Sequence, residues 1–404
     1  MSEIFFYVQN LLGIGHLRRA AVLAKAMAQA GLSVDFVAGG VPVPGLDPGP
    51  ARLVQLPPVR SADERFSALL DDRGVPIDEA WREGRRAALL EAFAASDPDA
   101  LLIELYPFGR RAFRFELLPL IEAASARPHR PEILCSVRDI LVEKGKSGRA
   151  EEAAALVERH FDAVLVHGDP AIAPFSASFP AADRIAGRLR YTGYVVEPRM
   201  PPEAPGPVPE GEVLLSAGGG AVGRPFVEAA LAARPISKAK GLPWRVVLGP
   251  QYPEPEAARL VAMAGPGLAV ERFRPDLAQL FAGCSLSISQ AGYNTVLELV
   301  AAGARAIVVP FSAGAESEQA ARARLFAERG LLTVVEEGLL GPAALARAID
   351  AALARPRPAP GGGLRLDGAR ATAAFLLEAV ARRRASRHDG AAPTGSGMGG
   401  QRRS

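Results

Sequence analysis

Short apolar runs alternate with amphipathic helical patterns along most of the chain. In the first half, the runs with the length of strands are Ile4–Val8, Ser33–Ala38, Ala51–Gln55, Ala100–Glu104, Ile133–Val137 and Ala163–Val166. The second half repeats the pattern with Glu212–Ser216, Trp244–Leu248, Leu268–Arg272, Leu286–Ser289, Ala306–Val309 and Leu332–Val335. The segments between them follow the helical period, for example 15–29, 226–233, 293–302 and 316–329. Strands that alternate with helices predict parallel sheets built from β-α-β units.

A proline-rich segment divides the chain into two halves of similar size. Residues 197–211 lack apolar periodicity and are crowded with proline, which is typical of a semi-rigid spacer. We therefore expect an α/β protein with two Rossmann-like parallel-sheet domains that face a cleft. The expected parts are an N-terminal domain 1–196, a hinge 197–211, a C-terminal domain 212–355, a crossover helix 364–385 and a disordered basic tail 386–404. A length of 404 residues also favours two domains.

Composition and charge reduce the number of functions to consider. The formal net charge is +3. The six arginines and one aspartate of residues 382–403 carry more positive charge than this, so the remainder is slightly negative and nucleic acid is not an expected partner. Cys135 and Cys284 lie in apolar runs, which is typical of buried thiols in a reducing compartment. Because no signal-peptide pattern and no apolar run of about 18 residues is evident, we expect a cytoplasmic protein.

Two glycine-rich turns each connect an apolar strand to a helix. Gly13-Ile14-Gly15-His16 follows the strand 4–8, and Gly218-Gly219-Gly220 follows the strand 212–216. The first turn of a helix has free N–H groups and a positive dipole end, which together favour an anion, phosphate above all. A plain tight turn is the alternative interpretation of each glycine run.

Polar residues also follow two later strands of the second half. The segment Ser289-Gln290-Ala291-Gly292 leads into a helix start with Asn294 and Thr295, and Glu298 lies one turn further on. Glu318 and Gln319 open the helix that follows the strand 306–309. Parallel strands end at a common edge, where open α/β sheets bind ligands, so these residues predict one crevice for phosphates and sugar hydroxyls. An acid near a helix start is also favourable by itself, which leaves a purely structural role open for Glu298.

These motifs resemble those of the two-domain GT-B glycosyltransferases, and within them the MurG-like group, which transfers N-acetylglucosamine from UDP to a lipid-linked acceptor. The resemblance is strongest over about 213–330, where Ser289, Gly292, Thr295 and Glu298 fit a Ser-x-x-Gly-x-x-Thr-x-x-Glu segment. It implies a GT-B fold whose C-terminal helix crosses back, a UDP-sugar as substrate, and neither a tightly bound cofactor nor a metal. The implied donor-binding residues are Gly218, Gly219, Gly220, Arg224, Phe273, Gln290, Gly292, Asn294, Thr295, Glu298, Glu318 and Gln319.

Within that implied set, each part of the donor has its own residues. Glu298 would bind the ribose hydroxyls, and the helix start at 292–295 would hold the diphosphate. The backbone near Phe273 would meet uracil, and Glu318 with Gln319 would contact the sugar. MurG-type enzymes carry a Gln-Gln pair where this chain has Glu318-Gln319, so the resemblance implies UDP more firmly than N-acetylglucosamine.

The glycine turn of the first half resembles the first glycine loop of the same enzymes, in which the histidine faces the cleft. Histidine titrates near working pH, which suits His16 as a general base. A histidine that only caps the helix or binds phosphate is the alternative, and Glu104, at the end of a strand, is a second candidate base. The expected acceptor-binding residues are Gly13, Gly15, Arg18, Arg138, Asp139 and His167. A dinucleotide site is excluded because Arg18 replaces the last glycine of that fingerprint, and the strand that follows ends without an acid.

The acceptor is less constrained than the donor. The stretch 103–120 mixes arginines with phenylalanines, which suits either contact with anionic lipid or an ordinary half-buried helix. The second N-terminal glycine loop of MurG-type enzymes is replaced here by ELYPFGRR, which argues against the peptidoglycan acceptor. The same region also resembles a bacterial group of predicted glycosyltransferases. Asp97-Pro98-Asp99 precedes a strand, so we interpret it as a turn and expect no metal site.

Together, these features predict an inverting glycosyltransferase that moves a sugar from a UDP-sugar to a hydroxyl. The acceptor is expected to be small or lipid-linked and related to the cell envelope, and a lipid-linked acceptor would place the protein at the inner face of the cytoplasmic membrane. A UDP-sugar 2-epimerase of the same fold and a non-catalytic nucleotide-sugar-binding protein stay open as alternatives.

Overall fold

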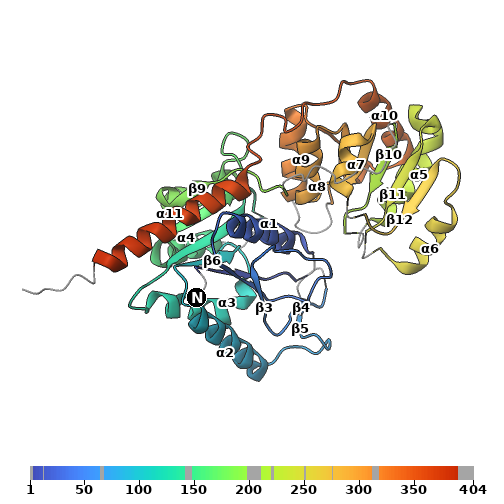
Figure 1. Cartoon of the computed structure of the whole chain (residues 1–404). Helices are drawn as coiled ribbons and strands as arrows, with labels where there is room; N and C mark the ends of the chain where they lie inside the picture. Colours follow the sequence, from blue (N-terminus) through green and yellow to red (C-terminus); the bar gives the residue numbers. More distant parts are fainter. Residues whose placement is uncertain are drawn as a thin grey trace, which may run out of the picture.

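The structure is a computed structural model with two parallel sheets, one in each half of the chain (Figure 1). It describes residues 3–11, 13–63, 68–141, 148–197, 211–219, 223–249, 252–274, 276–311 and 318–389, with the side chains of 386–389 left out. Most of the expected hinge, Gly220 and the residues after 389 therefore lie outside the described residues.

The N-terminal sheet has seven strands in the order β3-β2-β1-β6-β7-β8-β9, and every neighbouring pair is parallel. The strands are β1 Ile4–Val8, β2 Val34–Ala38, β3 Arg52–Gln55, β6 Ala100–Glu104, β7 Glu132–Arg138, β8 Ala163–His167 and β9 Leu189–Tyr191. Strands β1, β2, β6 and β8 are buried at every residue. Helices on both faces of a parallel sheet explain why these strands are continuous apolar runs rather than alternating ones.

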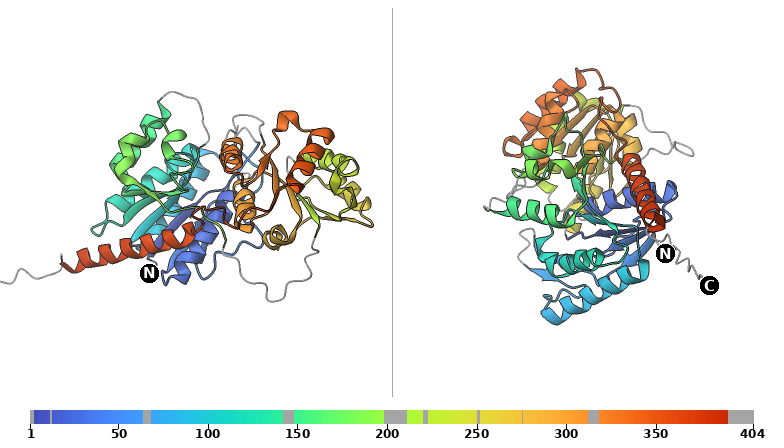
Figure 2. Two further views of the ribbon diagram at one scale, coloured as in Figure 1. Left: turned by 90° about the horizontal axis from the view of Figure 1, so that it is seen from above. Right: turned by 90° about the vertical axis from the view of Figure 1, so that its left-hand side faces the viewer.

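Helices cover both faces of the N-terminal sheet. One core cluster joins β1, β6 and β7 to α2 (Glu79–Ser96), α3 (Arg114–Ser125) and α4 (Arg149–His160). A second cluster, on the opposite face, joins the sheet to α1 (Gly15–Gln29) and to the final helix α11 (Gly368–Asp389). Figure 2 shows from two further directions that α11 runs along the N-terminal domain. The prediction of a C-terminal helix that crosses back is therefore confirmed.

The C-terminal sheet has six parallel strands in the order β12-β11-β10-β13-β14-β15. Its strands are β10 Val213–Ser216, β11 Trp244–Val247, β12 Leu268–Glu271, β13 Leu286–Gln290, β14 Ala306–Val309 and β15 Thr333–Val334. One face packs on α5 (Arg224–Ala233), α6 (Glu254–Ala262) and α10 (Pro342–Leu353). The other face packs on α7 (Leu277–Gly283), α8 (Tyr293–Ala302) and α9 (Glu318–Glu328). Both sheets are thus doubly wound, as the sequence predicts.

Two features of the N-terminal domain differ from the sequence analysis. The edge strand β9 and the small hairpin of β4 (Arg60–Ser61) and β5 (Leu69–Leu70) were not predicted, because they are short and lack an apolar run. The aromatic side chains of 103–120 pack inside the domain. Phe108 stacks edge-to-face on Phe175 and Phe179, and Phe113 is fully buried. Of the two interpretations of this stretch, the ordinary half-buried helix therefore fits the packing.

Candidate active site

The first glycine turn places His16 at the carboxyl edge of the N-terminal sheet. Strand β1 ends at Val8 and α1 begins at Gly15, so His16 lies in the first turn of the helix. Its Nδ1 lies 2.8 Å from Oε1 of Glu104, the last residue of the neighbouring strand β6. The side chain of His16 is 17% exposed, whereas that of Glu104 is fully buried. The two candidate bases are therefore hydrogen-bonded to each other.

The carboxylate of Glu104 is surrounded by donors. Arg19, one turn along α1, forms a buried ion pair with Oε1. Ser136 Oγ donates to Oε2 across 2.6 Å. Burial by itself raises the pKa of Glu104, but the charge of Arg19 and the hydrogen bond from His16 outweigh burial and hold that pKa well below its usual range. Glu104 is therefore an ionised acceptor that cannot readily take a proton from a substrate.

The state of His16 follows from this partner. Burial, and then the positive charge of Arg138, lower the pKa of His16 to about 3, so the imidazole is neutral at neutral pH. An ionised carboxylate only accepts hydrogen bonds, so Nδ1 of His16 carries the proton and donates to Glu104. The other nitrogen, Nε2, is then left with its lone pair. Orientation by a buried carboxylate suits proton acceptance at Nε2, whereas burial and the charge of Arg138 oppose it by lowering the pKa.

The hydrogen-bond chain continues behind Glu104 across the ends of three strands. Ser136 Oγ lies 2.8 Å from Nε2 of His167, and Nδ1 of His167 lies 2.8 Å from Thr192 Oγ1. His167 is fully buried, and burial, with a smaller contribution from the charge of Arg19, lowers its pKa to about 3. Both ring nitrogens of His167 are used inside the domain, so the prediction that His167 binds the acceptor stays a prediction that this packing does not favour. We expect this residue to support Glu104 instead.

Arg138 and Asp139, at the end of β7, contact the other domain. Arg138 Nη1 donates to both carboxylate oxygens of Glu318 at 2.8 Å. Arg322 Nη2 donates to Asp139 Oδ1 at 2.6 Å and to Glu318 Oε1 at 2.8 Å. Asp139 and Arg322 are both within 1% of full burial. Four charged side chains from α9 and from the end of β7 therefore form one buried cluster that joins the two domains.

This cluster bears on two expectations. Asp139 was expected to bind the acceptor, and Glu318 the sugar; in this structure both carboxylates are paired with arginines of the cluster, so their contact with a ligand stays a prediction. Burial raises the pKa of Glu318, but Arg138 and Arg322 outweigh burial and lower it to about 2. The physical reason is desolvation, since a carboxylate buried between two domains is stable only when it is paired.

Tyr293 lies at the centre of the same contact and was missed by the sequence analysis. It is the first residue of α8, and its hydroxyl donates to the backbone oxygen of His167 at 3.2 Å. The guanidinium groups of Arg19, Arg138 and Arg322 lie 5.2, 5.2 and 4.6 Å from the centre of its ring. Arg19 and Arg322 were also missed. The sequence could have indicated Arg19 and Arg322, because each is a charged residue at a position of an amphipathic helix where the neighbouring positions on the same face are buried.

The second glycine turn follows β10, the central strand of the C-terminal sheet. Gly218 adopts a φ of 61°, and Gly249, after the neighbouring strand β11, adopts 87°. A β-carbon on Gly249 would lie 2.3 Å from the backbone oxygen of Gly218, so the two turns are in direct backbone contact. Gly219 belongs to the same turn, and Gly220 lies outside the described residues. Bare backbone at this strand edge is therefore required by packing as well as suited to a phosphate.

The segment after β13 carries the expected ribose and diphosphate residues. Gly292 precedes α8, and no side chain caps the helix start, where Asn294 and Thr295 are half-buried. Glu298 lies one turn further on. Burial raises the pKa of Glu298 to about 7, although the nearby charge of Arg18 opposes this shift. A desolvated carboxyl group beside an uncapped helix start is the arrangement that the donor prediction requires.

The remaining donor residues lie at the same strand edge or near it. The side chain of Gln290 lies beside Gly218, with its Oε1 3.5 Å from the β-carbon position of that glycine. Phe273, just after β12, is 54% exposed. Gln319 is engaged, because its Oε1 accepts a hydrogen bond from the backbone N–H of Phe311 at 3.2 Å. Arg224, the first residue of α5, forms exposed pairs with Glu228 and Glu256, and its contact with the donor stays a prediction.

The first glycine turn meets the start of α8 across the domains. A β-carbon on Gly15 would lie 3.6 Å from Arg138 Nη2 and 3.9 Å from Asn294 Nδ2. The first turns of α1 and α8 therefore converge on one place, beside His16. Of the other expected acceptor residues, Gly13 and Arg18 are exposed on the α1 side of this place.

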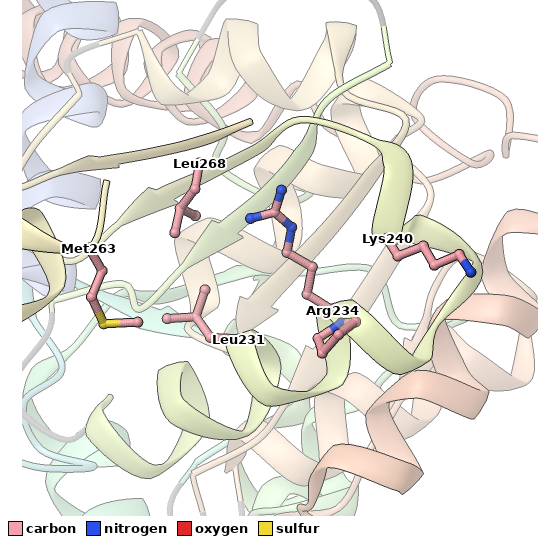
Figure 3. A pocket seen from close by; sticks show the side chains of 6 residues that line it. Leu231, Arg234, Lys240, Met263 and Leu268 are labelled. Carbon is pink, nitrogen blue, oxygen red and sulfur yellow. The ribbon is translucent and has the colours of Figure 1, made fainter. Parts of the chain in front are cut away.

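Other surfaces of the described residues offer less. A hollow of about 490 Å³ is lined by Leu231, Arg234, Pro235, Lys240, Met263 and Leu268 (Figure 3). It lies where α5 ends and β12 begins, at the edge of the sheet opposite to the glycine turns. Within the described part of the chain, no helix is long and apolar enough to cross a membrane. The same residues contain no group of three histidine, cysteine, aspartate or glutamate side chains placed to hold a metal ion.

Comparison with known sequences identifies relatives of the second half. Residues 213–360 match the glycosyltransferase family 28 C-terminal domain. One relative is the UDP-N-acetylglucosamine–N-acetylmuramyl-(pentapeptide) pyrophosphoryl-undecaprenol N-acetylglucosamine transferase of Ralstonia nicotianae. The two chains are 42% identical over 74 residues, and these residues make up 18% of this chain and 20% of that protein. This chain is also 37% identical over 126 residues to the enzyme of the same name from Rhodospirillum centenum, 31% of each chain. The chain therefore aligns with less than a third of the length of these curated relatives.

Comparison with solved structures extends the similarity to both domains. The calicheamicin glycosyltransferase CalG4 superposes with a TM-score of 0.58 at 16% identity and covers 97% of this chain and 99% of its own. MurG of Acinetobacter baumannii gives the same TM-score at 15% identity and covers 94% of this chain and 100% of its own. Identities this low establish the fold alone. Residues 213–360 thus resemble the C-terminal domain of family 28 glycosyltransferases, and the chain as a whole has the two-domain GT-B fold.

Proposed function

We propose that the protein is an inverting glycosyltransferase that moves a sugar from a UDP-sugar to a hydroxyl group of an acceptor. The C-terminal domain would bind the nucleotide, as the family 28 match of residues 213–360 suggests. The relatives named above carry N-acetylglucosamine transferase in their names, which makes UDP-N-acetylglucosamine the first donor to test. A small or lipid-linked acceptor would bind in the N-terminal domain.

One observation carries the proposal. His16, held by the buried carboxylate of Glu104, stands beside the place where the starts of α1 and α8 converge. A donor whose diphosphate rests on the start of α8 would present its anomeric carbon near His16. This arrangement joins an oriented proton acceptor to an anion site. The negative diphosphate would offset the charge of Arg138 that lowers the pKa of His16, and so would make the imidazole a better base.

The step follows from these positions. The acceptor hydroxyl loses its proton to Nε2 of His16 while its oxygen forms a bond to the anomeric carbon. The bond from that carbon to the diphosphate oxygen breaks, and the electron pair leaves with UDP. Attack from the face opposite to UDP inverts the anomeric configuration. Glu104 acts as a positioning residue, because its ionised carboxylate orients His16 and stabilises the imidazolium that forms.

The donor site is tested first by calorimetric titration with UDP, GDP and dTDP, in wild type and in Glu298→Ala. We expect selective binding of UDP and at least a tenfold loss in the variant, because a buried carboxyl that accepts from ribose hydroxyls contributes a charge-assisted hydrogen bond. Arg259→Ala, a change on α6 of the same domain that removes an exposed pair with Glu228, is the matched control and should bind UDP normally. Equal binding of all three nucleotides, or of none, would contradict the proposed donor site.

The base is tested with His16→Ala in an assay for UDP release from UDP-N-acetylglucosamine with added acceptor candidates. Loss of transfer with intact UDP affinity supports His16 as the base, whereas loss of UDP affinity would make it a phosphate ligand. Release of UDP and a free sugar by wild type in the absence of acceptor would instead favour an epimerase.

A further inference from the structure

The clearest unassigned feature is the place where α1 and α8 begin. Neither helix start is capped by a side chain, so backbone N–H groups of both first turns remain available. The two starts belong to different domains and approach each other at Gly15 and Asn294. Each helix adds the positive end of its dipole, so the two together favour a negative charge between them.

Arg138 presents one edge of its guanidinium to this place. Its Nη1 is fixed by both oxygens of Glu318, and its Cζ lies 5.2 Å from the centre of the Tyr293 ring. Its Nη2 is the atom that lies 3.6 Å from the β-carbon position of Gly15. Its Nε is buried and has no hydrogen-bond partner among the described residues. The side chain is therefore held rigidly through Nη1, and Nη2, beside Gly15, is the nitrogen left to meet an anion.

The charges around this place do not cancel. Three arginines have their own carboxylates: Arg19 with Glu104, Arg138 with Glu318, and Arg322 with Asp139. Arg110, in the loop after β6, has no carboxylate partner among the described residues, and its buried Nε has no hydrogen-bond partner there. Burial lowers the pKa of Arg110 to about 10, because a buried guanidinium without a carboxylate partner is destabilised in its charged form. An anion bound here would balance the excess positive charge.

We propose that Arg138 binds the terminal phosphate of the donor's diphosphate and stabilises it as the leaving group, across the cleft from the domain that binds the nucleotide. This inference rests on the proposed function. It moves Arg138 from the acceptor site, where the sequence analysis placed it, to the donor site. The terminal phosphate is the part of the donor that must reach both the start of α8 and the neighbourhood of His16, because it is bonded to the carbon under attack.

The chemical role follows from the step described above. When the bond between the anomeric carbon and the phosphate oxygen breaks, the electron pair stays on that oxygen and its negative charge grows. A guanidinium edge already fixed by Glu318 and Tyr293 meets that charge without rearranging, which favours the transition state over the ground state. Arginine suits this role better than lysine, because its planar fork donates two hydrogen bonds at once.

The test compares UDP with UMP, which lacks the terminal phosphate. For wild type we expect UDP to bind at least tenfold more tightly than UMP. In Arg138→Met this ratio should fall close to one, while the affinity for UMP changes little. Because Arg138 also joins the domains through Glu318, the matched control is Asp139→Asn. It removes the charge of the other ion pair between the domains, with Arg322, but leaves Arg138 and Glu318 in contact and should keep the wild-type ratio.

Two results would overturn the inference alone: Arg138→Met keeps the wild-type ratio, or Asp139→Asn loses as much of it as Arg138→Met. The second result would mean that Arg138 acts only by holding the domains together. Failure of the proposed function looks different, because wild type would then bind neither UDP nor UMP, and the inference would fall with it.

Discussion

The buried ion pair between Asp139 and Arg322 provides a direct test of how the two domains are joined in solution. The perturbation is Asp139→Asn, which removes one charge and almost no volume. Asp139 Oδ1 lies 2.6 Å from Arg322 Nη2 and also accepts from the backbone N–H of Ile140 at 2.9 Å. An asparagine can keep the second contact, so the change isolates the charge.

The magnitude follows from burial and from the remaining partner. Loss of one member of a fully buried ion pair typically costs about 3–5 kcal/mol, because the other charge is left unpaired away from water. Arg322 retains Glu318 at 2.8 Å, so we expect the lower end, about 3 kcal/mol of unfolding free energy. The matched control is Glu336→Gln. It breaks a pair with Arg324 on the same helix, but that arginine is 61% exposed, and the expected loss is below about 1 kcal/mol.

The chain contains two tryptophans, one in each domain, which makes the assay specific. Trp81 lies in α2 of the N-terminal domain, and Trp244 is buried in β11 of the C-terminal domain. Urea unfolding followed by fluorescence of Trp81→Phe and Trp244→Phe chains reports each domain separately. Because the pair joins the domains, Asp139→Asn should shift both transitions. A loss no larger than that of Glu336→Gln would refute the reasoning and would mean that the interface is open to water.

Three further predictions concern single positions. Gly249 has a φ of 87°, and Gly249→Ala places a methyl group against the backbone of Gly218. We therefore expect a loss of about 1–3 kcal/mol in stability and weaker UDP binding. The control Gly241→Ala adds a methyl group that meets nothing within 4 Å and should change neither quantity. Because the pKa of His167 is lowered to about 3, the unfolded chain binds a proton between pH 6.5 and 3 that the folded chain does not. Stability measured by urea unfolding should therefore fall on acidification, and His167→Gln should reduce that slope by about 1.4 kcal/mol per pH unit; an unchanged slope would contradict the neutral buried imidazole. The pKa of Glu298 is raised to about 7, so its carboxyl becomes protonated below pH 7. UDP titrations from pH 8 to pH 6 should therefore show an affinity that falls more steeply in wild type than in Glu298→Gln. Parallel curves for the two proteins would contradict a contact between an ionised Glu298 and the ribose.

The sequence predicts the strands of both sheets well because most of them are buried on both faces and read as unbroken apolar runs. Strand β9, with the sequence Leu189-Arg190-Tyr191, pairs only with β8 at the edge of the sheet and carries an arginine, so it leaves no such signal. The rule that parallel strands end at one edge also located most candidate residues, including His16 and Glu104. What it could not supply was the partner of each residue.

Partners depend on the arrangement of the domains and on packing depth, neither of which is encoded locally. Arg138 and Glu318 are 180 positions apart, and each looks like a free polar group at the edge of its own sheet. Only the closed arrangement of the two domains turns them into a pair. His167 ends a strand as His16 begins a helix, but the short strand β9 and Thr192 cover it. The sequence therefore predicted where the chemistry lies better than which residues face the ligand.

The strand order also explains why the candidate residues of both domains lie at the equivalent place in the two sheets, between the first strand of the domain and its neighbour. In the N-terminal sheet, β1 is followed in sequence by β2 on one side, while β6 pairs with it on the other, so the loops after β1 and β6 diverge and leave a gap at their carboxyl ends. His16 and Glu104 occupy the two sides of that gap. In the C-terminal sheet, β10 is flanked in the same way by β11 and β13, and the glycine turn at Gly218 and the start of α8 occupy its two sides. The interdomain ion pairs bring these two gaps together. The candidate base and the candidate phosphate site therefore meet because of the strand order of the two sheets. The side chains of Arg138 and Tyr293 lie between the gaps and would contact a ligand bound there.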